Sequence, residues 1–268
     1  FNSLRAERPM DATHEVDIDT VVEESRGGPF SNPLDSTPID TVGRIEGNHC
    51  VTAANVAKYD AYHSLIIFNE PHPHKLNKPA LQEAVNIASK WFNNHEGFPF
   101  LMWNCLWKSG ASIVHAHMQM TVAQKQPYRY IRNLLQAQKA YREMFDEEYT
   151  SEWRRVHKDL GLSVTDRNGS IYASLTPVKE KEIVCFPKSL DTLGNQIFTV
   201  KKTFLSMGVE SFNMGLYLPK DEEHPIFARF VDRGQLHKKT TDIGGVELLA
   251  DESIVSADPF KLIQAFTD

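Results

Sequence analysis

The order of predicted elements occurs twice along this chain, and that repeat limits the fold more than any other feature of the sequence. Two apolar strand-like segments, an amphipathic helix and two further strands follow one another over residues 49–53, 63–68, 81–92, 98–105 and 112–122. The same order returns over residues 170–175, 182–186, 191–207, 211–218 and 226–231, without evident sequence identity. The pattern predicts an α+β protein built from two similar halves.

The pattern also predicts four segments. Residues 1–43 are polar and acidic and contain glycines and prolines that interrupt regular structure, so we expect an arm that packs over the core. Residues 44–126 form the first half, which carries the candidate site. Residues 127–160 are predicted to be a connecting amphipathic helix. Residues 161–268 form the second half and end in a short C-terminal helix.

The composition is that of a folded globular protein that needs no disulfides. Of the 268 residues 41% are hydrophobic, and the formal net charge of -6 disfavours binding to nucleic acid or to acidic membrane surfaces. Cys50, Cys105 and Cys185 lie far apart without a CxxC pair, which argues against a disulfide framework and a cysteine-rich zinc site. No apolar stretch approaches the roughly 20 residues of a membrane helix. We therefore expect a cytoplasmic protein.

One stretch in the first half combines the residues that carry chemistry. If residues 112–122 form a strand, alternation places His115, His117 and Gln119 on one face. The preceding Gly110-Ala111-Ser112 turn lets backbone N–H groups approach an anion, and the serine hydroxyl can donate to a phosphate oxygen. A neutral imidazole is a nucleophile near pH 7, so the arrangement suits phosphoryl chemistry. A pair of metal ligands and a pair of buried structural histidines remain alternatives.

Asn104, Gly110-Ala111-Ser112 and His115-Ala116-His117-Met118-Gln119 together resemble the signature of the histidine triad superfamily, in its transferase branch. That branch includes galactose-1-phosphate uridylyltransferase, diadenosine tetraphosphate phosphorylase and ADP-glucose phosphorylase. Gln119 stands where the hydrolase branch carries histidine, and it is the discriminating detail. Residues 55–67 are similar to the upstream family pattern of asparagine, turn, histidine and apolar strand. The resemblance implies two tandem halves of the histidine triad type, with an antiparallel sheet flanked by helices.

The resemblance further implies a ping-pong reaction of a nucleotidyltransferase or phosphorylase. His117 attacks the α-phosphorus of a nucleoside di- or polyphosphate compound and forms a covalent nucleotidyl-histidine intermediate. Gln119 is expected to hydrogen-bond a phosphoryl oxygen, and His115 to support the site. Asn104 and Ser112 are expected to hold phosphate oxygens. The nucleotide then passes to phosphate or to a sugar phosphate.

Further site residues are expected around this centre. By family position Asn55 lies near the nucleotide, with Ile66 or Phe68 as candidate walls for the base, whereas His63 is interpreted as structural. The second half lacks a His-x-His pair near residues 226–231 and is therefore predicted to be the degenerate copy. Its candidate ligands for the sugar or the distal phosphate, chosen because a guanidinium fork suits phosphate, are Asn213, Arg229 and Arg233. Solvated surface arginines are the alternative.

Two departures from the family pattern concern cofactors and specificity. Ala116 replaces the proline found between the two histidines of the uridylyltransferases, and their paired zinc-binding cysteines have no counterpart. We expect that no cofactor is required; a structural or catalytic divalent metal is an alternative that the cysteine spacing does not support. The His72-Pro73-His74 segment is interpreted as a loop rather than a metal pair. These departures favour a phosphorylase-like relative.

The expected partners are a nucleotide or nucleotide sugar as substrate and phosphate or a sugar phosphate as acceptor. No nucleic acid or membrane partner is expected, and a homodimer is implied by the family alone. Two other functions remain open at this point. One is a nucleotide hydrolase of the same fold, against which Gln119 argues because it is neither an acid nor a base. The other is a catalytically silent nucleotide- or metal-binding protein.

Overall fold

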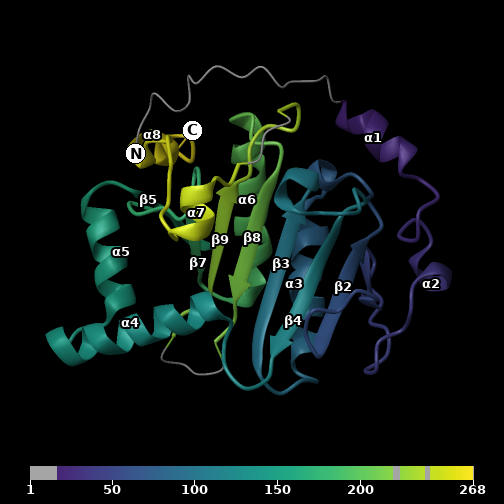
Figure 1. Cartoon of the computed structure of the whole chain (residues 1–268), viewed down its shortest axis with the longest axis horizontal. Helices are drawn as coiled ribbons and strands as arrows, with labels where there is room; N and C mark the ends of the chain where they lie inside the picture. Colours follow the sequence, from purple (N-terminus) through teal and green to yellow (C-terminus); the bar gives the residue numbers. More distant parts are fainter. Residues whose placement is uncertain (1–16, 220–223, 239–241, 268) are drawn as a thin grey trace.

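A single antiparallel sheet of nine strands crosses the molecule in the order β1-β2-β4-β3-β8-β9-β7-β6-β5 (Figure 1). The computed structural model describes residues 17–219, 224–238 and 242–267. Within them the strands are β1 (Cys50–Ala54), β2 (Tyr62–Phe68), β3 (Phe98–Cys105), β4 (His117–Ala123), β5 (Ser163–Asp166), β6 (Gly169–Ala173), β7 (Ile183–Pro187), β8 (Phe212–Tyr217) and β9 (Phe227–Asp232). The structure confirms the α+β class and the antiparallel sheet flanked by helices.

The strand order shows how the two similar halves are joined. The first half contributes β1-β2-β4-β3 and the second β8-β9-β7-β6, so that the order of one half is mirrored by the other. The halves meet where β3 pairs with β8, from Phe100 opposite Tyr217 to Cys105 opposite Phe212. Because this junction is a main-chain ladder, both halves belong to one continuous sheet.

One face of the sheet is covered by two long helices, α3 (Lys78–Phe92) and α6 (Leu190–Ser206), one from each half (Figure 1). The side chain of Asn77 caps the N-terminus of α3 by accepting a hydrogen bond from the backbone N–H of Ala80. The two helices approach closely at Gly194, where an added Cβ would lie 2.5 Å from the Cα of Gln82. The apolar faces of both helices and the inward side chains of the strands form one core.

A buried lysine also links the two halves. Lys201 of α6 is 3% exposed, and its ammonium group donates to the backbone oxygens of His74 and Leu76 at 2.6 and 2.7 Å. His74 and Leu76 lie at the short 3-10 helix η2 (Pro73–Lys75) and directly after it. The second half therefore holds the loop that follows β2.

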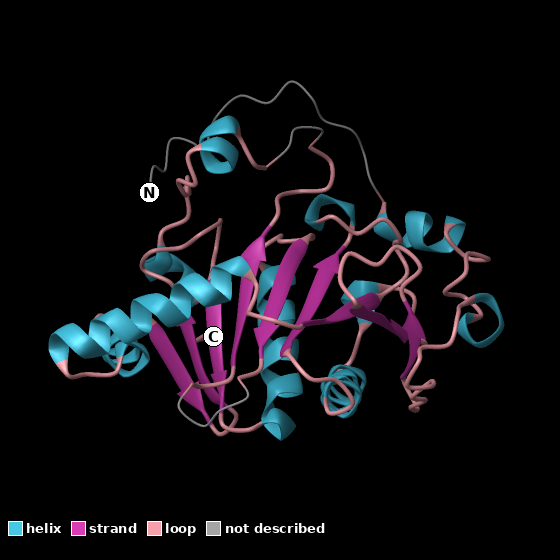
Figure 2. Ribbon diagram, turned by 60° about the horizontal axis from the view of Figure 1, so that its bottom comes forward, coloured by secondary structure: helices cyan, strands magenta, loops and turns pink. Residues whose placement is uncertain are grey.

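The other face of the sheet carries different segments in its two halves. Two helices, α4 (Arg129–Phe145) and α5 (Tyr149–Asp159), pack over the second half (Figure 2). The arm lies beside the first half with the short helices α1 (Ile18–Glu24) and α2 (Pro33–Ser36). The chain ends with α7 (Gly245–Leu249) and α8 (Pro259–Gln264). Within the part of the chain that is described, every helix is too short or too polar to span a bilayer.

Three predicted elements differ from the structure. The predicted helix over 127–160 is two helices, because α4 ends at Phe145 and the next residue, Asp146, is left-handed, with φ of 54°. The predicted strand over 112–122 begins only at His117, since the preceding residues form a loop. The arm contains two short helices, and the part of it before residue 17 lies outside the described residues.

Candidate active site

Strand β4 carries two of the predicted site residues on the face opposite to α3 and α6. Met118, Met120 and Val122 alternate with them and are fully buried in the core. His117 lies opposite Ile67 of β2, and Gln119 lies opposite Leu65. The pattern of alternation therefore predicted the orientation of His117 and Gln119 correctly.

His115 precedes the strand and is held by the end of β2. Its Nε2–H donates to the backbone oxygen of Phe68 at 2.7 Å, since a carbonyl oxygen can only accept. Burial lowers the pKa of this imidazole, so it is neutral at pH 7. The backbone oxygen of His115 in turn accepts a hydrogen bond from His117. His115 thus supports its neighbour through the main chain.

The bonding of His117 leaves one ring nitrogen available for attack. Nδ1–H donates to the backbone oxygen of His115 at 2.9 Å, which places the unshared electron pair on Nε2. The side chain is buried, with an exposed fraction of 6%, and burial lowers its pKa below 6.5. His117 is therefore a neutral imidazole of defined tautomer at pH 7, which is the nucleophilic form.

Gln119 is oriented by His63, a residue that sequence analysis interpreted as structural. The ring Nε2 of His63 lies 2.9 Å from Gln119 Oε1 and 2.9 Å from Asn55 Nδ2, and one ring nitrogen cannot both donate and accept. Nδ1 of His63 is buried without a hydrogen-bond partner. Because a buried N–H without an acceptor costs more than an unshared electron pair, we assign the proton to Nε2. The approach of Asn55 Nδ2 to this nitrogen is then a contact between two donors and not a hydrogen bond. His63 then donates to Gln119 Oε1, and the amide N–H2 of Gln119 is left for a ligand.

Asn55 and Tyr59 complete this part of the site. Asn55 Oδ1 accepts the backbone N–H of Ala57 at 2.8 Å, which fixes its amide beside His63. The hydroxyl of Tyr59 lies 3.3 Å from Gln119 Oε1, and its ring packs on His63 at a centroid distance of 4.1 Å. Asn55 and Gln119 therefore lie on the same ring nitrogen of His63, and the role of Asn55 beside a nucleotide stays a prediction.

The loop between β3 and β4 is a tight turn whose backbone N–H groups are used within the loop. The N–H groups of Ser109 and Ala111 donate to the backbone oxygen of Leu106 at 3.2 and 3.3 Å, and that of Gly110 donates to the backbone oxygen of Trp107 at 3.0 Å. Leu106 begins it with φ of 67°, a conformation that costs a non-glycine residue about 1–3 kcal/mol and that clusters at functional sites. After the short helix η3 (Trp107–Ser109), Gly110 adopts φ of 95°, which a side chain would strain. Ala111 is buried and Ser112 is exposed. The N–H groups of Gly110 and Ala111 are therefore not free to bind an anion, contrary to the expectation from the sequence, whereas Ser112 is exposed.

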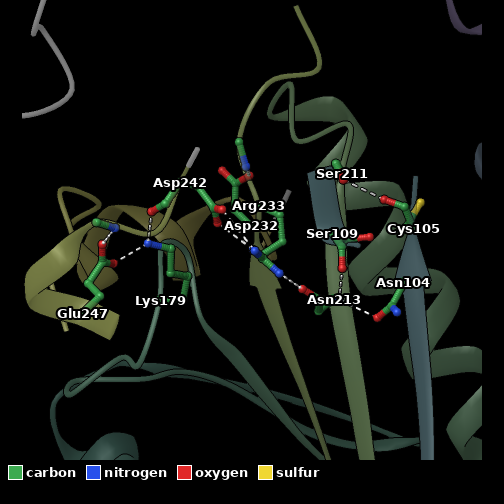
Figure 3. A network of polar contacts seen from close by, with 12 residues as sticks. Asn104, Cys105, Ser109, Lys179, Ser211, Asn213, Asp232, Arg233, Asp242 and Glu247 are labelled. Atoms are coloured by element: carbon green, nitrogen blue, oxygen red, sulfur yellow. Dashed lines mark hydrogen bonds and ion pairs between the residues drawn. The ribbon is translucent and has the colours of Figure 1, made fainter. Parts of the chain in front are cut away.

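Asn104 is connected to the second half by a chain of polar contacts (Figure 3). Asn213 of β8 donates to Asn104 Oδ1 at 2.7 Å and to the backbone oxygen of Ser109 at 2.9 Å. Arg233 donates to Asn213 Oδ1 and forms two bonds to Asp242, at 2.6 and 3.0 Å. Asn213 and Arg233 thus bind protein groups here, and Asn213 holds the loop that follows β3 through the backbone oxygen of Ser109.

Arg229 is not brought to the site. It faces Gly215 of β8, which faces Met102 of β3, which faces Gln119. Three strand spacings of about 4.8 Å separate Arg229 from Gln119 by roughly 14 Å. Its Nε donates to Glu182 at 2.5 Å, and its guanidinium lies over the ring of Tyr130. The sequence suggested Arg229 as a ligand for the sugar or the distal phosphate, but in the structure it pairs with Glu182.

The apolar wall near His117 differs from the predicted one. Ile66 and Phe68 are buried against the core on the far face of β2, so the prediction that either lines a base pocket is wrong. The residues on the site face form a separate apolar cluster of Phe30, Val51, Ala53, Leu65 and Ile67, with Ile113 packed against it. Phe30 from the arm contacts the rings of His117 and His115, at centroid distances of 5.2 and 6.1 Å. Nothing periodic in the sequence around Phe30 indicates this contact.

The described residues contain no group of three or more side chains suited to hold a metal ion. The His72-Pro73-His74 segment is a turn, in which His74 Nε2–H donates to the backbone oxygen of Glu210 at 2.6 Å. His72 Nδ1 accepts the backbone N–H of His74 at 3.2 Å. One nitrogen of each imidazole is thus used within the protein.

Comparison with solved structures identifies the fold, whereas comparison of the sequence identifies no family. No family model matches the chain, and no curated protein matches it. The solved structure of ADP-glucose phosphorylase from Arabidopsis thaliana with bound ADP-glucose aligns with a TM-score of 0.77 and 14% identity, over 100% of this chain and 94% of that one.

Two other solved structures agree with this result. A GalT-like protein from Arabidopsis thaliana aligns with a TM-score of 0.74 and 13% identity, over 91% of this chain and 92% of that one. A uridylyltransferase aligns with 0.70 and 13%, over 95% and 92%. The resemblance predicted from the motif is thereby confirmed for the fold.

Proposed function

We propose that this chain, which has the fold of ADP-glucose phosphorylase and of a uridylyltransferase, is a nucleotidyltransferase or phosphorylase that forms a covalent intermediate on His117. The observation that carries the proposal is the state of that imidazole: it is neutral, its Nδ1–H is held by the backbone of His115, and Nε2 keeps its electron pair. The substrate is a nucleoside di- or polyphosphate compound.

Two displacement steps at phosphorus account for the reaction. In the first, His117 Nε2 attacks the α-phosphorus, a P–N bond forms, and the bond from phosphorus to the leaving phosphate oxygen breaks with its electron pair on that oxygen. In the second, an oxygen of phosphate or of a sugar phosphate attacks the same phosphorus, and the P–N bond breaks. The neutral imidazole is regenerated, so no net change occurs on the enzyme.

Three groups lower the barrier by binding the charge that develops on the phosphoryl oxygens. The amide N–H2 of Gln119 donates to one of them, because His63 holds the amide oxygen. The hydroxyl of Ser112 donates to another. Asn104 binds from β3, in the position set by Asn213. Because His63 and Asn213 hold Gln119 and Asn104 in place before the substrate arrives, these two donors need little reorganisation.

Transfer is favoured over hydrolysis by the chemistry of Gln119. A neutral amide cannot take a proton from water, so it does not activate water to attack the intermediate. The apolar side chains of Phe30, Leu65 and Ile67 also keep water away from His117. The intermediate therefore survives until a phosphate oxygen, which is already ionised, arrives.

The bound compounds of the structural neighbours support the substrate class. One neighbour binds ADP-glucose, and a yeast phosphorylase in complex with Ap4A aligns with a TM-score of 0.50 over 90% of this chain and 79% of that one. We propose a nucleotide sugar or a dinucleoside polyphosphate as substrate here. Phosphate or a sugar phosphate as acceptor, a homodimeric assembly and a cytoplasmic location belong to the same proposal.

The dependence of turnover on phosphate tests the proposal. Purified protein is incubated separately with ADP-glucose, UDP-glucose and diadenosine tetraphosphate, with and without inorganic phosphate, and the nucleotide products are separated. We expect one substrate to give a nucleoside diphosphate only when phosphate is present. A nucleoside monophosphate released at the same rate without phosphate would show a hydrolase instead. His49→Ala, which changes a histidine outside the site, is the control for His117→Ala.

A further inference from the structure

Part of the arm, residues 25–36, forms a strap beside the first half that is anchored at both of its ends (Figure 1). Val22 of α1, shortly before the strap, is buried. Asp40, shortly after it, is buried as well and accepts a hydrogen bond from the indole N–H of Trp91 at 2.8 Å. The strap therefore has fixed ends, and its middle is free to follow other contacts.

Between these anchors one side chain of the strap is buried. Phe30 is 7% exposed, whereas every other residue of the strap is exposed or half-buried. The polar contacts of the strap stay within the described part of the arm, as in the hydrogen bond from the N–H of Gly27 to Ser31 at 3.1 Å and the ion pair of Arg26 with Glu23 at 2.6 Å. The buried contact between the strap and the sheet thus rests on one ring.

The ring of Phe30 covers the proposed nucleophile. It meets the imidazole of His117 edge to face, with ring centres 5.2 Å apart, and packs with Leu65 and Ile67 on the site face of β2. His117 is only 6% exposed beside it. In-line attack needs phosphorus about 3–3.5 Å from Nε2, with its oxygens and a nucleoside around it. A side chain covered to this degree leaves no room for such a group.

Phe30 is also the cover that can move without breaking the sheet. Ile67 belongs to β2 and pairs directly opposite His117 in the ladder. The loop before β4 is tied to the rest of the first half, because the N–H of Ala116 donates to a backbone oxygen of the loop after β2 at 2.8 Å. Phe30, by contrast, lies on a segment whose polar contacts are local. Opening the site therefore means lifting the strap.

We propose that the strap is a lid that closes the active site of the free protein, and that an incoming nucleotide displaces Phe30 and places its base in the apolar slot that the ring leaves. The slot is lined by Val51, Ala53, Leu65 and Ile67. One planar ring replaces another there, since both bury an aromatic face. The identity of the ligand rests on the proposed function, whereas the closure over His117 does not.

The lid changes how ligands reach His117. A nucleotide must offset the burial of Phe30, so its apparent affinity is lowered by the fraction of molecules in which the lid is closed. Inorganic phosphate has no ring to fill the slot and leaves the lid closed. Once a nucleotide is bound, its base shields His117 from water as Phe30 does in the free protein.

Chemical modification of His117 tests the closure without any nucleotide. Diethylpyrocarbonate, which acylates neutral imidazoles, is added at pH 7, and peptide mass spectrometry gives the rate at His117 relative to that at His49. We expect this rate to rise about 10- to 100-fold in Phe30→Ala, the factor that corresponds to burial of a phenylalanine side chain. Leu34→Ala changes an exposed residue of the same strap and is the matched control, with the rate unchanged.

Affinity for nucleotides tests the displacement, because a lid and a fixed wall of the site give opposite signs. Binding of AMP, GMP and UMP, which carry no leaving group beyond the α-phosphate, is measured by equilibrium dialysis. We expect one of them to bind Phe30→Ala about tenfold more tightly than the wild type, and Leu34→Ala to bind it as the wild type does. In the wild type the same nucleotide, but not inorganic phosphate, should speed cleavage by trypsin after Arg26.

The outcomes separate this inference from the proposed function. Equal modification rates in the wild type and Phe30→Ala would overturn the inference, and so would weaker binding of the nucleotide to Phe30→Ala. A nucleotide that binds the wild type without changing cleavage after Arg26 would overturn it as well. If neither protein binds any of the three nucleotides while the modification rates differ, the closure stands and the proposed function fails.

Discussion

The hydrogen bond from His63 to Gln119 makes a sharp prediction, because it acts on catalysis without holding the fold together. His63→Phe keeps an aromatic ring against Tyr59 but removes the donor that holds Gln119 Oε1 at 2.9 Å. In the wild type a rotated Gln119 amide would lose a bond of about 1 kcal/mol and would place an N–H against another donor, at a cost of about 1–3 kcal/mol. The rotated form is thus populated at a few per cent or less.

In His63→Phe the two orientations of Gln119 become nearly equal in free energy. Population alone then lowers the rate about twofold, and the complete loss of an oxyanion donor, about 100- to 1,000-fold, is the upper bound. We expect a fall in kcat of about tenfold, with little change in KM. Stability should change by less than about 1 kcal/mol, because the substitution also removes the unpartnered Nδ1 from the interior.

The assay is the rate of nucleotide transfer in a double-mutant cycle with Gln119→Ala, together with urea unfolding of each variant. His63→Phe should have almost no further effect once Gln119 is alanine, because the coupling acts through that amide. Tyr59→Phe, which removes the longer contact at 3.3 Å, is the matched control and should lower kcat less than twofold. Independent effects of the two substitutions, or a loss of kcat that follows a loss of stability, would refute the reasoning.

Three further predictions concern other parts of the structure. Arg233→Met breaks the chain of contacts to Asn213 and should lower kcat at least fivefold at saturating substrate; an unchanged kcat in steady-state assays would contradict this. Lys201→Met leaves two buried carbonyl oxygens without donors and should lower the free energy of unfolding by about 2–4 kcal/mol. A free energy of unfolding in urea equal to that of the wild type would contradict this. The folded-state pKa of His117 is lowered and that of His74 falls to about 4, so the unfolded chain binds protons that these imidazoles do not. Stability should therefore decrease as the pH falls below 6.5, measured by thermal unfolding; stability constant from pH 7 to 5 would refute the assignment.

Periodicity predicted the parts of the fold in which each side chain has one clear environment. The alternation along β4 placed His117 and Gln119 on the site face, because their neighbours are apolar and the sheet has a covered side. The repeat of element order appeared in the structure as a mirrored strand order. Local pattern was sufficient where burial decides the outcome.

Contacts between residues distant in sequence were not predictable in the same way. Arg229 and Arg233 lie on and just after one strand, yet Arg229 faces buried Glu182 and Arg233 faces Asp242, and no local rule distinguishes them. Ile66 and Phe68 were assigned to the wrong face because a strand of continuous apolar residues has no visible alternation. The contact of Phe30 with His117 was not predictable either, because the surface that the arm covers determines its position.

The covalent intermediate on His117 is the central claim, and intact-protein mass spectrometry measures it directly. The protein is mixed separately with ADP-glucose, GDP-sugars, UDP-sugars and diadenosine tetraphosphate, in the absence of phosphate or any other acceptor, and its mass is recorded. The account predicts a gain of one nucleoside monophosphate with one of these compounds, absent in His117→Ala, present in His49→Ala and lost on adding the acceptor. Product formation without any adduct, or the same adduct on His117→Ala, would contradict it.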